Sequence, residues 1–194
     1  MLGIDPRRVG MIALTAAALA LAACQGAKAP PPAASGGIGG PFSLIAPDGS
    51  TVTDKTFAGK PFAIYFGYTR CPDVCPTSLS RMARLRKALG PAGDRFAIVF
   101  VSVDPEHDKP KAIGEYVKLF GTPIIGLTGS EAQLKTIERE YGVYVNKVPQ
   151  KNGDYLVDHS AATLLFDGRG QLADIISPDQ PDAEALAKLR ALAS

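Results

Sequence analysis

Short apolar segments alternate with amphipathic ones along most of this chain, and this alternation limits its possible folds most strongly. Segments 62–66 and 96–103 are nearly continuous apolar runs, which are typical of strands buried on both faces of a sheet. In 76–89 the apolar residues recur at helical spacing, and Gly90 ends the pattern. A chain built from these two patterns predicts an α/β fold with a mixed sheet.

The rest of the chain extends this order on both sides. Pro47-Asp48-Gly49-Ser50 lies between two short apolar stretches in 42–60, which predicts an N-terminal β-hairpin. We expect further helices at 111–120, 130–141 and 182–192, and further strands at 124–127, 143–148, 155–157, 162–166 and 171–176. This order matches a thioredoxin-like fold, in which helices flank a central mixed β-sheet.

The first forty residues differ from this pattern. Arg7 and Arg8 precede an uncharged apolar run, 9–23, that is shorter than the about 20 residues of a membrane-spanning helix. The run is typical of a secretory signal peptide. It ends in Leu21-Ala22-Ala23-Cys24, which resembles the lipobox of bacterial lipoproteins, where the cysteine is lipidated. An ordinary cleavage site or an uncleaved anchor is the alternative.

Three parts of the chain follow from this interpretation. We expect a lipoprotein signal peptide over 1–23, the Cys24 lipid anchor with a flexible Pro/Ala/Gly linker over 24–40, and one folded domain over 41–194. About 150 residues are enough for one well-buried core. The expected location is the periplasmic face of a membrane.

Charge excludes one class of function. The chain carries 21 Lys and Arg against 19 Asp and Glu, without a basic cluster, and has no tryptophan. Nucleic-acid binding usually needs a basic patch and often stacking aromatic side chains. The sequence therefore gives no support for a nucleic-acid partner.

Two cysteines lie where the first predicted core strand meets the first helix. Cys71 and Cys75 form a C-x-x-x-C motif, and ligands of open α/β sheets gather at such carboxyl ends of strands. The positive end of the helix dipole is expected to favour the Cys75 thiolate. The pair can hold a soft metal ion, Cu(I) or Zn(II), or it can close a disulfide.

A metal ion here would need a third ligand, and the chain has only two histidines. His159 precedes the strand 162–166, and in a thioredoxin-like topology the loop before that strand faces the first helix N-terminus. We therefore expect His159 to lie over the cysteine pair as a ligand. His107 is interpreted as a solvated loop residue, and Cys24 is assigned to the anchor.

Three blocks of the sequence resemble, in order, the motifs of the Sco/SenC family, whose members bind copper and help to assemble the CuA centre of cytochrome c oxidase. The blocks are Phe66-Gly67-Tyr68-Thr69-Arg70-Cys71-Pro72-Asp73-Val74-Cys75-Pro76, then Val101-Ser102-Val103-Asp104-Pro105 followed by Asp108 and Pro110, then Asp158-His159-Ser160. His107 departs from the pattern at a loop position that varies.

The resemblance implies a thioredoxin-like fold and a copper ion, Cu(I) or Cu(II), held by Cys71, Cys75 and His159. It implies that the partner is the CuA-bearing subunit of cytochrome c oxidase, with other periplasmic copper chaperones or thiol reductases as further partners. The implied role is that of a metallochaperone, which transfers copper without catalytic turnover.

Two enzymatic hypotheses compete with this one. Export would place Cys71 and Cys75 in an oxidising compartment, so a thiol–disulfide oxidoreductase that keeps the recipient's cysteines reduced is the main alternative. Such enzymes usually carry C-x-x-C and a cis-proline, whereas Ala161-Ala162-Thr163 stands at the corresponding place here. A peroxiredoxin needs a threonine three residues before its reactive cysteine, and Thr69 lies two before Cys71.

Overall fold

The computed structural model of the chain describes residues 37–151 and 153–194. The predicted signal peptide, Cys24 and most of the predicted linker lie outside the described residues. No helix within the described ranges is long and apolar enough to cross a membrane.

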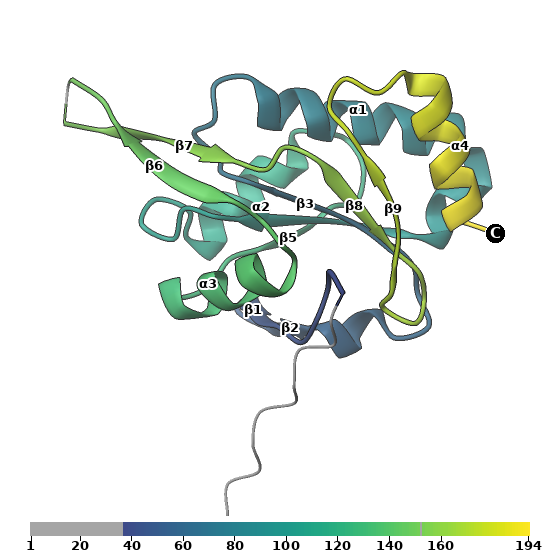
Figure 1. The fold of residues 1–194 in the computed structure, drawn as a ribbon, viewed down its shortest axis with the longest axis horizontal. Helices are drawn as coiled ribbons and strands as arrows, with labels where there is room; N and C mark the ends of the chain where they lie inside the picture. The colour runs from purple at the N-terminus through teal and green to yellow at the C-terminus, as the bar shows by residue number, and fades with distance from the viewer. Residues whose placement is uncertain (1–36, 152) are drawn as a thin grey trace, which may run out of the picture. The chain divides into compact units, whose positions relative to one another are not determined.

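A five-stranded mixed sheet forms the centre of the fold, with the strand order β5-β4-β3-β8-β9 (Figure 1). β3 runs parallel to β4, β4 runs parallel to β5, and β8 is antiparallel to both β3 and β9. The strands are β3 (Phe62–Gly67), β4 (Ala97–Ser102), β5 (Ile125–Leu127), β8 (Thr163–Phe166) and β9 (Leu172–Ile176). The predicted α/β fold with a mixed sheet is confirmed.

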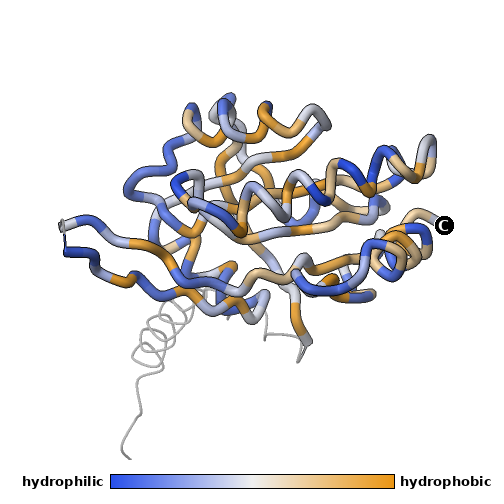
Figure 2. Tube along the Cα trace, turned by 90° about the horizontal axis from the view of Figure 1, so that it is seen from above, coloured by the Kyte–Doolittle hydropathy of each residue, from blue (hydrophilic) through white to orange (hydrophobic). Residues whose placement is uncertain are grey.

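β3 and β4 are buried along their whole length, as the two continuous apolar runs predicted. Burial on both faces leaves no solvent-facing side chain to interrupt the run. Figure 2 shows these central segments as hydrophobic, whereas the outer end of the hairpin that precedes β8 is hydrophilic. The sheet is therefore the rigid centre of the fold, and the loops that carry candidate site residues follow the ends of its strands.

The helices pack against the sheet, and their apolar side chains join those of the strands in two buried clusters. They are α1 (Val74–Ala88), α2 (Pro110–Lys118), α3 (Glu131–Glu140) and α4 (Asp182–Leu192), with short 3-10 helices at η1 (Asp54–Phe57) and η2 (Gly90–Arg95). In one cluster Met82 of α1 and Leu189 of α4 pack with Ile98 of the sheet. As predicted, Ser130 caps α3, its hydroxyl accepting the Gln133 N–H at 3.3 Å.

Two hairpins lie outside the central sheet. The predicted N-terminal hairpin is present as β1 (Ser43–Ile45) and β2 (Thr51–Thr53). The second consists of β6 (Val145–Pro149) and β7 (Tyr155–His159), and it extends away from the sheet edge in Figure 1. His159 was expected in a loop but is the last residue of β7, because its backbone pairs with Val145.

Candidate metal centre

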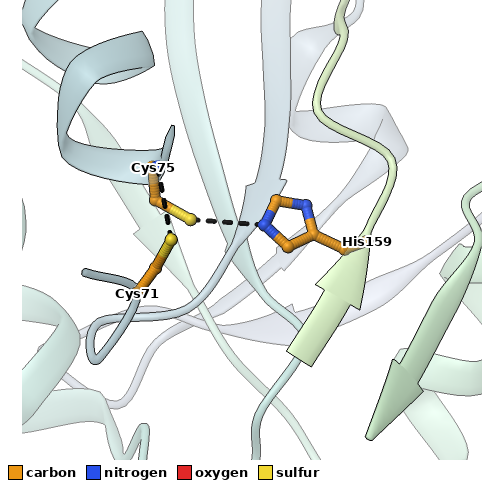
Figure 3. A group of neighbouring side chains, drawn as sticks. All are labelled: Cys71, Cys75 and His159. Carbon is orange, nitrogen blue, oxygen red and sulfur yellow. Dashed lines mark hydrogen bonds between the residues drawn. The ribbon is translucent and has the colours of Figure 1, made fainter. Parts of the chain in front are cut away.

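Three segments of the chain bring Cys71, Cys75 and His159 together (Figure 3). Cys71 lies in the loop after β3, Cys75 is the second residue of α1, and His159 ends β7. One ligand atom from each of the three residues lies within 4.8 Å of the others. The fold therefore brings Cys75 and His159 into contact although they are 84 residues apart in the sequence.

The loop between β3 and α1 fixes both sulfur atoms. The Cys71 N–H donates to the Tyr68 carbonyl at 3.2 Å, and the Cys75 N–H donates to Cys71 Sγ at 3.4 Å. Gly67 lets the second sulfur approach the end of β3, since a Cβ at that position would lie 2.9 Å from Cys75 Sγ. Both cysteines are free thiols, so the pair is a reduced dithiol.

Hydrogen bonding defines which nitrogen of His159 is available. Nδ1 lies 2.9 Å from the Ser160 carbonyl oxygen, which can only accept, so Nδ1 carries the proton. The neutral ring then presents the lone pair of Nε2, which lies 3.3 Å from Cys75 Sγ. In the metal-free state the Cys75 thiol donates to this nitrogen. A backbone carbonyl thus orients the imidazole as such contacts commonly orient metal ligands.

Burial keeps both groups neutral. Desolvation lowers the pKa of His159, so the ring is uncharged at neutral pH. Desolvation also raises the pKa of Cys75, well above that of a free thiol. The prediction that the helix dipole favours the Cys75 thiolate is therefore wrong for the metal-free dithiol, because the side chain is 0% exposed and the cost of burying a charge exceeds the dipole's effect.

Two tyrosine rings pack against the imidazole of His159. The ring centroids of Tyr65 and Tyr68 lie 6.0 and 6.1 Å from that of His159, with interplanar angles of 86° and 89°. Edge-to-face contacts of this kind favour one ring orientation. Together with the two buried cysteines they form a site with little access for water.

Asp108 is a positioning residue that sequence reasoning missed. Its buried carboxylate accepts the Thr69 N–H at 2.9 Å and the Ser102 hydroxyl at 2.6 Å, and it also accepts the Thr69 hydroxyl. These bonds tie the loop that carries Cys71 to the end of β4. Asp108 stood in the second motif block, but nothing in the sequence showed that its carboxylate reaches a residue 39 positions away.

The donor set suits a soft metal ion. Two sulfurs and one imidazole favour Cu(I) or Zn(II) over hard cations. A sulfur at about 2.3 Å and a nitrogen at about 2.0 Å from a shared tetrahedral ion lie about 3.5 Å apart. The 3.3 Å between Cys75 Sγ and His159 Nε2 is close to this value, so the residues fit a metal with only small movements.

Comparisons with known proteins match this architecture. The SCO1/SenC family model matches residues 31–194. A curated relative, the mitochondrial "Protein SCO1 homolog 1" of Arabidopsis thaliana, is 46% identical over 140 residues, which are 72% of this chain and 42% of that protein. The chain spans about half the length of the curated relatives it matches.

Solved structures are similar as well. ScoI of Bradyrhizobium japonicum, whose structure has copper bound, is 42% identical with a TM-score of 0.74, and the match covers 80% of this chain and 99% of that one. A SCO1/SenC family lipoprotein from Bacillus anthracis is 26% identical with a TM-score of 0.70, over 81% of this chain and 95% of that one.

Proposed function

The chain belongs to the SCO1/SenC family, and we propose on this basis that it is a metallochaperone that delivers copper to the CuA site of cytochrome c oxidase. Cys71, Cys75 and His159 are the proposed copper ligands. The observation that carries the proposal is the convergence of two thiols and one imidazole lone pair within 4.8 Å. Copper is the cargo of this function, and the protein's task is to take it up and release it.

Uptake by this site requires the thiols to lose their protons. The Cys75 proton lies between Sγ and His159 Nε2 in the metal-free state, and both atoms become ligands once it leaves to water. Because burial raises the pKa of Cys75, the ion must displace a tightly held proton. Acidification therefore favours release of the cargo, by about tenfold in affinity per pH unit for each proton exchanged.

The alternative function is thiol–disulfide exchange that keeps the recipient's CuA cysteines reduced. The free, adjacent thiols are compatible with it. The third converging donor favours metal binding instead, because thiol–disulfide exchange needs only the two thiols, whereas a metal ion can use the lone pair of His159 Nε2 that lies 3.3 Å from Cys75 Sγ. Metal transfer is therefore the function that the geometry supports better.

Copper transfer tests the proposal directly. The chain loaded with one equivalent of Cu(I) is mixed with the metal-free CuA-bearing domain of the oxidase, and the two proteins are separated for copper analysis. We expect copper to appear on the recipient. If copper stays on the chain while the recipient's disulfide is reduced by the metal-free form, the protein is a reductase and the metallochaperone proposal fails.

The site of action is also proposed. Leu21-Ala22-Ala23-Cys24 and the similarity to a family lipoprotein support a lipid anchor at Cys24 that faces the periplasm. Intact-mass measurement of the protein from the membrane fraction tests this. We expect a chain that starts at Cys24 with added lipid mass, and an unmodified Cys24 in a stable membrane-bound protein would contradict the anchor.

A further inference from the structure

A second group of potential ligands lies at the other end of β7. Asp104, Glu106 and His107 are in the loop between β4 and α2, and one ligand atom from each lies within 4.8 Å of the others. Tyr155, the first residue of β7, joins them. His107 lies in a loop and its side chain is 36% exposed, as its interpretation as a solvated residue predicts, but it is held by neighbours that this interpretation did not include.

The Tyr155 hydroxyl is the centre of the group. It lies 2.6 Å from Asp104 Oδ1, 3.0 Å from Glu106 Oε2 and 3.0 Å from His107 Nδ1. His107 Nδ1 is in turn 2.9 Å from Asp104 Oδ2. Five polar atoms from four side chains therefore lie close together. The group lies between the buried Asp104 and solvent.

These contacts outnumber the protons that can serve them. The Tyr155 hydroxyl has one hydrogen to donate. His107 Nδ1 has at most one more. Ionised carboxylates supply no hydrogen, so these four contacts share at most two hydrogens, and at least two contacts have no hydrogen of their own. Converging lone pairs favour a cation.

The charge on Glu106 supports the same conclusion. Lys147 Nζ lies 2.7 Å from Glu106 Oε1, so the two side chains form an ion pair. The lysine occupies Oε1 and leaves Oε2 facing Tyr155. The carboxyl groups of Asp104 and Glu106 therefore lie beside the imidazole of His107. Lys147 contacts Glu106 and also the Tyr155 ring, with Nζ 4.4 Å from the ring centroid.

Distances and donor types indicate which ion fits. Two ligands about 2.0 Å from one ion and at a right angle lie about 2.8 Å apart, and Asp104 Oδ2 and His107 Nδ1 lie 2.9 Å apart. Mixed nitrogen and oxygen donors with such angles suit Cu(II) or Ni(II), and Cu(II) binds most tightly among the divalent first-row ions. This donor set contains no sulfur, which distinguishes it chemically from the thiol centre.

We propose that Asp104, Glu106 and His107 form a second metal site, which binds a divalent transition-metal ion and prefers Cu(II). Tyr155 orients Asp104 by donating a hydrogen bond to Oδ1. Tyr155 and His159 are four residues apart on one strand, so they share a face of β7 at a spacing of about 13 Å. The second site is thus separate from the thiol centre, and it stands independently of the metallochaperone proposal.

The two histidines of the chain allow a clean test. The full chain is prepared in detergent with Cys24, Cys71 and Cys75 replaced by serine and with His159→Ala, so that His107 is its only histidine. Cu(II) is titrated against a competing chelator, and the electron paramagnetic resonance spectrum is recorded. We expect one equivalent of Cu(II), with hyperfine coupling from a single imidazole nitrogen and no sulfur ligand.

Two further substitutions in this background complete the test. His107→Gln keeps a polar side chain and should weaken Cu(II) binding by about tenfold or more, whereas Lys147→Gln keeps every proposed ligand and should change the affinity only a few-fold. The proposal is overturned if the parent binds no Cu(II) or if His107→Gln binds as tightly as the parent. If His107→Gln lowers only the melting temperature, the group is a structural latch for the β6–β7 hairpin.

Discussion

The two ends of β7 offer a metal ion opposite surroundings. At one end His159 faces two buried sulfur atoms, and at the other Tyr155 faces two carboxylates and an imidazole close to solvent. At the first end, burial raises the pKa of the Cys75 thiol and lowers the pKa of the His159 imidazole, so both groups are uncharged at neutral pH. At the second, Glu106 forms an ion pair with Lys147. On the two proposals, one strand would serve a soft ion at one end and a borderline divalent ion at the other.

The largest effect should come from removing one sulfur. We expect Cys75→Ser to weaken Cu(I) binding by about a thousandfold or more, because a hydroxyl is a poor ligand for a soft ion. Competitive Cu(I) titration measures the change. Cu(II) binding at the His107 end should be unchanged in the same variant. Cu(I) affinity within tenfold of the parent would show that the thiols are not the centre of the site.

The next effect concerns the loop that carries Cys71. Asp108→Asn replaces a carboxylate that accepts three hydrogen bonds with a group that has one acceptor oxygen. We expect the free energy of unfolding to fall by about 2–3 kcal/mol, since bonds to a buried charge are worth about 1.5–3 kcal/mol each. The Cu(I) affinity should fall as well.

Glu115→Gln is the matched control for this substitution, because Glu115 forms only an exposed ion pair with Lys111 at 3.9 Å among the described residues. Denaturant unfolding of both variants measures the two changes. The control should stay within about 0.5 kcal/mol of the parent. Equal effects of Asp108→Asn and Glu115→Gln would contradict the positioning role of Asp108.

The smallest effect is the alkaline pH dependence of the metal-free fold. The pKa of Cys75 is raised on folding, so the folded state binds more protons than the unfolded state above the ordinary thiol pKa of about 8.5. Stability from this group is fully present below that pH and is lost as the pH rises, by at most about 1.4 kcal/mol per pH unit.

Denaturant unfolding between pH 8 and 10 measures this slope. Cys75→Ser should flatten it, whereas removing the exposed His107 by His107→Gln should leave it unchanged. An identical slope in Cys75→Ser and the parent would show that burial of this thiol does not set the alkaline stability.

Sequence patterns predicted the fold better than they predicted the chemistry of the sites. The continuous apolar runs of β3 and β4 and the helical spacing of α1 depend on local periodicity, which the sequence displays directly. The C-x-x-x-C motif was also local. The raised pKa of Cys75 depends on how many atoms cover the sulfur in the finished fold, which a helix N-terminus does not reveal.

Long-range contacts account for the other differences. Asp108 contacts Thr69 across the end of the sheet, and Tyr155 contacts the loop of His107 across 48 positions of sequence. Neither pairing leaves a periodic signal in the chain. His159 was expected in a loop because its strand is short and polar, and only pairing with Val145 makes it part of β7.

The central claim is that His159 is the third ligand of a copper ion, and His159→Ala tests it most directly. Competitive Cu(I) titration of this variant is run beside the parent and His107→Ala, and the dithiol reduction potential of each is measured. We expect His159→Ala to weaken copper binding by well over tenfold, above about 1.4 kcal/mol, with a nearly unchanged potential, and His107→Ala to match the parent. Unchanged copper affinity with a shifted potential in His159→Ala would instead assign the histidine to thiol redox chemistry and contradict the copper site.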